Sequence, residues 1–90
     1  MLTLPAQLTQ REAAALTAQL QQRLRHESTQ AVQVDASALN RFDSSALAVM
    51  LQLRRDALAD GKAFTVHGLP RQLAGLAGLY GVAELLGEAS

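Results

Sequence analysis

The sequence predicts an α/β fold in which a largely parallel sheet is covered by helices. The 90 residues are too few to build a second core, so we expect a single domain over residues 1–90. Short β-branched and apolar segments alternate with segments of helical period. About 10 to 20 residues of helical pattern separate successive strands, which is typical of crossover connections between parallel strands.

The N-terminal third predicts a short strand followed by an amphipathic helix. Residues 2–4 alternate apolar and polar side chains, which favours a short edge strand. Thr9 and Glu12 have the spacing of a capping box, so they mark a helix start. The helix is expected over residues 10–26, because leucines recur at intervals of four along one side: Leu16, Leu20 and Leu24.

The middle of the chain predicts a strand and then the most buried helix. Residues 31–35 are short, apolar and β-branched, as strands are. From residue 43 to residue 60 the period becomes helical, and Gly61 supplies the left-handed position that ends the helix. Its apolar arc is wide enough for burial on more than one side and contains Ala46, Leu47, Val49, Met50, Leu51, Leu53, Ala57 and Leu58.

The C-terminal part repeats the alternation. Residues 63–67 form the second clear strand pattern, which Gly68 interrupts. Pro70 is suited to the first turn of a further helix, because its missing N–H costs nothing there. Gly81 closes this helix, and residues 82–86 are long enough for one more short turn of helix.

The composition excludes several functions. Eight Lys and Arg balance eight Asp and Glu, and aromatics make up 3% of the chain, so we expect neither nucleic acid nor lipid surfaces as partners. The absence of cysteine excludes disulfides, a thiolate nucleophile and the common structural zinc sites. The longest apolar run, residues 46–51, is far shorter than the about 20 residues of a membrane span. With no basic, apolar leader at the N-terminus, we expect a cytoplasmic protein without direct membrane insertion.

Catalysis and metal binding have weak support in the sequence. A hydrolase could in principle use Ser44 or Ser45 with His67 and Asp35, but there is no Gly-x-Ser-x-Gly elbow. We interpret His67 as a strand-end residue with a partly exposed ring, and His26 as a cation at the C-terminal end of its helix. We therefore expect no enzyme activity, no metal site and no cofactor.

Three glycines recur at intervals of three in the last helical segment: Gly75, Gly78 and Gly81. They follow no strand directly and are not followed by Lys-Ser or Lys-Thr, so a phosphate loop is disfavoured. Glycines on one side of a helix instead allow its backbone to approach a neighbouring element or a partner closely.

The most informative stretch is residues 40–47, where Asp43, Ser44 and Ser45 enter the buried helix. Either Asp43 or Ser44 can serve as its N-cap, and a structural cap is one interpretation. The other is functional, because a hydroxyl at a helix N-terminus can carry a phosphate without destroying the helix. That phosphate would add negative charge beside Asp43 and repel a docked partner.

Residues 34–37 and 42–47 resemble the strand–loop–helix signature of the STAS domain family, which anti-sigma-factor antagonists share with sulfate-transporter tails. The resemblance implies a STAS-like mixed sheet, largely parallel, from which the usual N-terminal strand of the family is missing. It also implies that Ser45 matches the phosphoacceptor of the antagonists, with Ser44 as the other candidate, and that Ala46 replaces the family's usual glycine.

Residues 64–69 and 76–82 are similar to the ending of the MlaB-like branch, the small STAS subunit of bacterial Mla phospholipid transporters. This resemblance implies a non-catalytic accessory subunit that binds the ATPase of an ABC-type transporter maintaining outer-membrane lipid asymmetry. Such a subunit is peripheral to the inner membrane through its partner. The alternative that the family implies is an anti-sigma factor antagonist that binds an anti-sigma factor kinase and is regulated by serine phosphorylation.

The resemblance places the partner-binding surface on the loop and on the outer face of the helix that follows it. Arg54 falls within the apolar arc of that helix, so its stem packs while its guanidinium reaches solvent, or it contacts a partner. Tyr80 is expected in the core with its hydroxyl at the edge, or else at the partner surface. A homodimer stays possible. The partner-binding residues are Arg41, Phe42, Asp43, Ser44, Ser45 and Arg54.

Overall fold

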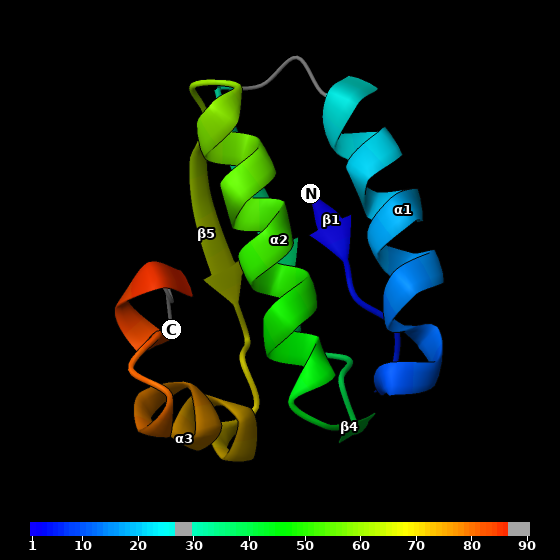
Figure 1. Ribbon diagram of the computed structural model, residues 1–90, viewed down its shortest axis with the longest axis vertical. Coiled ribbons are helices and arrows are strands. Elements are labelled where there is room, and N and C mark those ends of the chain that lie inside the picture. Colours follow the sequence, from blue (N-terminus) through cyan, green and yellow to red (C-terminus); the bar gives the residue numbers. More distant parts are fainter. Residues whose placement is uncertain (27–29, 87–90) are drawn as a thin grey trace.

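A computed structural model describes residues 1–26 and 30–86 and contains a parallel sheet with helices packed on it (Figure 1). The main sheet has three strands in the order β1-β3-β5, and both of its pairings are parallel. A second, two-stranded parallel sheet pairs β2 with β4. The strands are β1 (Leu2–Thr3), β2 (Gln7–Leu8), β3 (Ala31–Asp35), β4 (Arg41–Phe42) and β5 (Ala63–His67).

Two long helices lie side by side over the same face of the main sheet, and β5 passes behind the second of them (Figure 1). A shorter helix and a 3-10 turn follow β5 and lie beside the first half of the second helix. These elements are α1 (Gln10–His26), α2 (Ser45–Ala59), α3 (Arg71–Leu79) and η1 (Ala83–Leu86). Among the described residues no helix is long and apolar enough to cross a membrane.

The core lies between the sheet and the helices. In β3, Val32 and Val34 are fully buried, whereas Ala31 and Gln33 on the opposite face are exposed. This alternation shows that the helices cover one face of the sheet. No polar or charged residue among those described is buried, so aliphatic packing holds the two layers together.

The helix expected to be the most buried is α2, and this expectation is confirmed. It contacts α1 on one side, η1 on the other and β5 beneath. Leu58 is the exception, because it is 47% exposed although the sequence places it in the apolar arc. Leu47 shares its side of α2 and is buried, but Leu58 lies in the last turn, beyond the part of α2 that η1 covers (Figure 1).

Every element that the sequence predicts is present, with shifts of one or two residues at the ends. The capping box at the start of α1 is confirmed, since the Thr9 N–H donates to Glu12 Oε1 at 2.9 Å. β1 is an edge strand, as expected, because it pairs with β3 alone in its sheet. β2 and β4 were not predicted.

Candidate docking site at the start of α2

The short strands β2 and β4, which the sequence did not predict, hold the chain between β3 and α2 in place. This connection is called the loop below. The carbonyl of Ala6 accepts hydrogen bonds from the backbone N–H groups of Asn40, at 2.7 Å, and Arg41, at 3.0 Å. Leu8 then pairs with Phe42 in the short ladder. The chain between β3 and α2 is therefore fixed at the carboxyl ends of the strands, where parallel sheets usually place their functional groups.

Asp43 connects the starts of two helices. Its Oδ1 accepts the backbone N–H of Ser45 at 2.8 Å, and its Oδ2 accepts the backbone N–H of Gln10 at 3.1 Å. The first bond caps α2 and the second anchors the start of α1. The hydrogen bond from the Ser45 N–H, followed by that from Gln10, lowers the pKa of Asp43 below its ordinary value.

The two serine side chains are not needed for this cap. Ser44 occupies the N-cap position of α2, but its side chain makes no capping hydrogen bond and is exposed. Ser45 is half-buried in the first position of the helix. Of the two residues that could serve as cap, Ser44 therefore has the position and Asp43 supplies the hydrogen bond. The hydroxyl of Ser44 remains available to a partner or a modifying enzyme.

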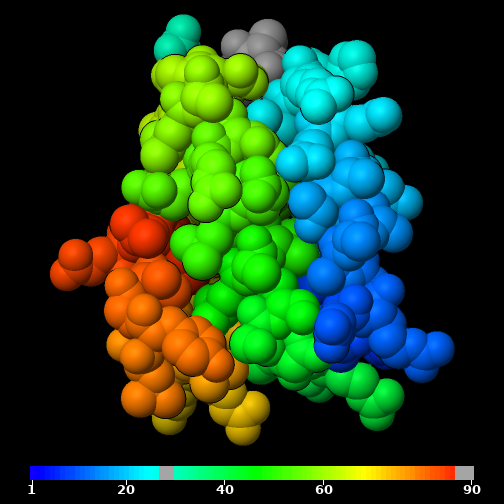
Figure 2. All heavy atoms as spheres, in the orientation of Figure 1, coloured from blue at the N-terminus to red at the C-terminus, as the bar shows by residue number. Residues whose placement is uncertain are grey.

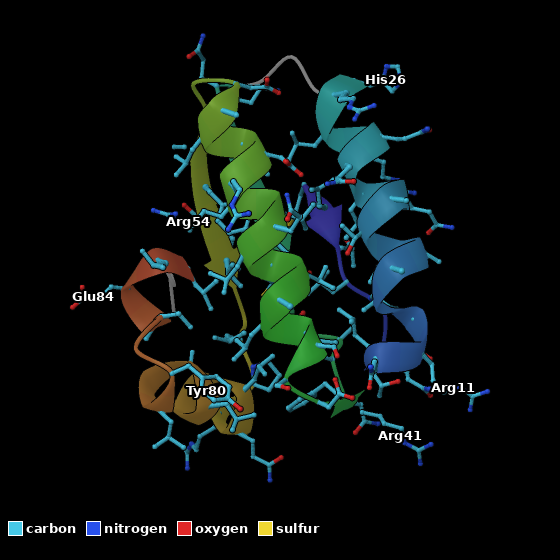
Figure 3. All side chains as sticks on the ribbon, in the orientation of Figure 1. Arg11, His26, Arg41, Arg54, Tyr80 and Glu84 are labelled. Atoms are coloured by element: carbon cyan, nitrogen blue, oxygen red, sulfur yellow. The ribbon has the colours of Figure 1, made fainter. Side chains whose placement is uncertain are left out.

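The other predicted partner-binding residues divide into two groups. Arg41 is exposed beside the loop, and Phe42 is half-buried because its ring packs against the core. Arg54 is also half-buried but lies nine residues beyond Ser45, about 14 Å along the helix. Figure 3 shows Arg54 well away from the end of the molecule that carries Arg41. The structure therefore does not bring Arg54 together with the loop.

Two further residues change the predicted surface. Arg11, which the sequence did not single out, points outward at the same end of the molecule as Arg41 (Figure 3). No sequence pattern relates these two arginines, because they are brought together by the short pairing of β2 with β4. Tyr80 is 60% exposed, so the expectation that it lies in the core is wrong. It is the C-cap residue of α3.

No Ser-His-Asp arrangement forms among the described residues. Asp35 Oδ1 accepts the Ser37 hydroxyl at 2.6 Å and the Ser37 N–H at 2.9 Å, and these bonds lower the pKa of Asp35. His67 is the strand partner of Asp35, but its Nε2 is buried without a hydrogen-bond partner within residues 1–26 and 30–86. His67 is half-buried at the end of β5, which fits the strand-end interpretation.

Two hollows, of about 170 and 420 Å³, lie between α1 and α2, and neither is lined by a residue of the loop. In the described part of the chain, no three His, Cys, Asp or Glu side chains are grouped to hold a metal ion. Figure 2 shows the outer surface of α2 between that of α1 on one side and those of α3 and η1 on the other.

Comparisons with known proteins agree with this description. The family model described as "Mlab, STAS domain" matches residues 1–87, which is nearly the whole chain. A search of curated proteins found no match. The matched family has the same mixed arrangement of a parallel sheet and helices, and its members are generally non-catalytic. The chain therefore belongs to the STAS domain family, and to its MlaB type.

Proposed function

We propose that the chain is a non-catalytic accessory subunit that binds the ATPase subunit of an ABC-type phospholipid transporter and assists its assembly or activity. In this role it lies on the cytoplasmic side of the inner membrane through its partner, and it contributes to outer-membrane lipid asymmetry. The match to the MlaB-type family model over residues 1–87 favours this role over the other functions known in the family.

One structural observation carries the proposal to particular residues. Asp43 supplies the cap of α2, so the fold does not use the exposed hydroxyl of Ser44. The exposed Arg41 lies beside this helix start and offers a cationic side chain, which suits acidic groups of a partner. We place the contact with the ATPase on Arg41, Asp43, Ser44 and Ser45.

Co-purification with the ATPase subunit tests the proposal. The tagged chain is expressed in cells that contain the complete transporter and is recovered without a crosslinker. We expect the ATPase subunit to be recovered with it in a fixed ratio. Recovery of the folded chain without the ATPase subunit would contradict the proposal.

A charge at Ser44 locates the contact. Ser44→Glu adds a negative charge at a helix N-terminus, where the fold tolerates it, so the circular dichroism spectrum should be unchanged. Recovery of the ATPase subunit should fall several-fold, because the new charge lies in the interface. Gln22→Glu adds the same charge at an exposed position of α1 and should leave the recovery of the ATPase subunit unchanged. Equal recovery with both variants would place the contact elsewhere.

The exposed hydroxyl also favours a second candidate, a phosphorylation-regulated antagonist that binds an anti-sigma factor kinase. The test is incubation with the anti-sigma factor kinase of the same organism and ATP, followed by intact-mass measurement. A gain of about 80 Da, one phosphoryl group, that Ser45→Ala or Ser44→Ala abolishes would favour the antagonist over the transporter subunit. An unchanged mass would eliminate it.

A further inference from the structure

The two hollows between α1 and α2 adjoin each other, because Gln21 lines both of them. Together they form a trough that is bounded by residues 13–25 and 48–60. The larger hollow, of about 420 Å³, lies nearer the starts of the two helices, and the smaller, of about 170 Å³, lies beside their last turns. Figure 2 shows the face of the molecule on which the surface of α1 meets that of α2.

The larger hollow is lined mainly by small apolar side chains and by no charged residue. Ala14, Ala18 and Ala48 line its walls and are exposed. The hydroxyl of Thr17, which also lines it, donates to the carbonyl of Ala13 at 2.7 Å and is therefore satisfied within α1. This end of the trough suits an uncharged apolar side chain.

The smaller hollow is acidic and lies at the C-terminal end of α2. Its charged lining residues are Asp56, Asp60 and Arg25, so carboxylates outnumber cations. Asp60 is the C-cap of α2, and the last turn of this helix contains Asp56 and no basic residue. The C-terminal end of a helix is the negative end of its dipole. The two carboxylates therefore lie where a cation is favoured.

Asp56 is held in place by neutral donors. Gln21 Nε2 donates to its Oδ2 at 2.7 Å, and Gln52 Nε2 donates to its Oδ1 at 3.2 Å. Within residues 1–26 and 30–86 these two amides are the side-chain partners of the carboxylate, and no Lys or Arg forms an ion pair with it. A half-buried carboxylate that is oriented in this way, without a counter-charge, suits a Lys or Arg side chain of a partner.

We propose that the trough receives an amphipathic helix of the ATPase subunit, which places an apolar side chain in the larger hollow and a Lys or Arg at Asp56 and Asp60. Ala48 and Asp56 are eight residues apart, about 12 Å along α2, so the two anchors are about two turns apart on the incoming helix. Ala48 lies one turn from Ser45, so the same partner reaches both the loop and the trough. This inference rests on the proposed transporter role and gives the chemistry of the partner's contact segment.

Calorimetric titration of the purified full chain with the purified ATPase subunit tests the apolar anchor. Ala18→Phe fills the larger hollow from the α1 side, so the dissociation constant should rise at least tenfold. The matched control Ala15→Phe adds the same ring at an exposed position of α1 outside the trough and should leave the dissociation constant unchanged. Circular dichroism verifies that each variant is folded, and Ala14→Gln is the second blocking variant should Ala18→Phe fail to fold.

Charge reversal in the same titration tests the acidic anchor. Asp60→Lys should raise the dissociation constant about tenfold at low salt and less at high salt, because salt screens the charges. Glu84→Lys makes the same change at an exposed position of η1 and should have no effect. If the parent chain binds the ATPase subunit and either trough variant binds it equally well, the trough proposal is overturned and the transporter role stands. If the parent chain does not bind the ATPase subunit, both are overturned.

Discussion

At the scale of single residues, Asp43 maintains the starts of two helices, and the side chain of Ser44 is not needed for them. One carboxylate accepts the N–H groups of Ser45 and Gln10, which belong to different helices. The hydroxyl next to it, on Ser44, makes no capping bond. The serine can therefore be replaced without loss of the helix start, because the aspartate maintains it.

Two alanine substitutions test this division. Ser44→Ala should change the free energy of unfolding by less than about 0.5 kcal/mol, although serine caps usually contribute about 1 kcal/mol. Asp43→Ala should lower the melting temperature by several degrees, because it removes hydrogen bonds at the starts of α1 and α2. Thermal unfolding followed by circular dichroism measures both. A larger loss from Ser44→Ala than from Asp43→Ala would contradict the assignment.

Three carboxylates have lowered pKa values in the folded protein, so each makes the protein less stable in acid. Hydrogen bonds from Thr9, Ser37 and Ser45 lower the pKa values of Glu12, Asp35 and Asp43, respectively. A group whose pKa is lower in the folded state adds stability above its unfolded pKa and loses it as the pH falls through the folded pKa. The stability that these three carboxylates add should therefore be fully present near neutral pH and be lost as the pH falls below about 4.5.

Urea unfolding at a series of pH values measures this loss, and Asp43→Ala should show a smaller loss in acid than the parent chain. The comparison is confined to pH values below about 5, the range in which carboxylates titrate. An identical acid dependence in the two proteins would show that Asp43 does not contribute.

At the scale of elements, the hydrophobic period of the sequence predicts the longer helices and strands but fails for the two-residue strands. α1, α2, β3 and β5 follow from their apolar spacing, because each has enough residues to show a period. β2 and β4 have two residues each and no period to detect. The carbonyl of Ala6 supports their pairing, because it accepts the N–H groups of Asn40 and Arg41. Local sequence does not encode this contact between distant segments.

The same distinction applies to the candidate site. Asp43, Ser44 and Ser45 are adjacent in the sequence, so their place at a helix start was predictable. The hydrogen bond from Gln10 to Asp43 spans 33 residues and depends on how α1 packs beside α2. The exposure of Tyr80 depends on where α3 ends against the core, which the helical spacing of its leucines does not determine.

The turn between β5 and α3 gives a prediction at this scale. Gly68 has a φ of +70°, and a Cβ atom on it would lie 2.8 Å from Cβ of Ser37. Gly68→Ala should therefore lower the free energy of unfolding by more than about 1 kcal/mol, because both the backbone conformation and the contact with the neighbouring loop are unfavourable. Gly75→Ala, where space is open, should instead stabilise the monomer by about 0.5–1 kcal/mol in dilute solution. Equal effects from the two substitutions in urea unfolding would contradict this account.

At the scale of the whole molecule, the domain has one aliphatic core and no buried polar network among the described residues. A chain of 90 residues buries a modest fraction of its surface, and the total stability of such domains is about 5–15 kcal/mol. With cysteine absent, cavities in this core are not compensated by disulfides. Folding therefore depends on a few central side chains.

Leu53 and Leu58, in the same helix, test this dependence with the same chemical change. Leu53 is 0% exposed and Leu58 is 47% exposed. Leu53→Ala should reduce the free energy of unfolding by about 2–5 kcal/mol, because it leaves a cavity between α2 and its neighbours. Leu58→Ala should cost less than about 1 kcal/mol, because that side chain is already half in water. Urea unfolding measures both, and a loss for Leu58→Ala as large as that for Leu53→Ala would place the core on the wrong side of α2.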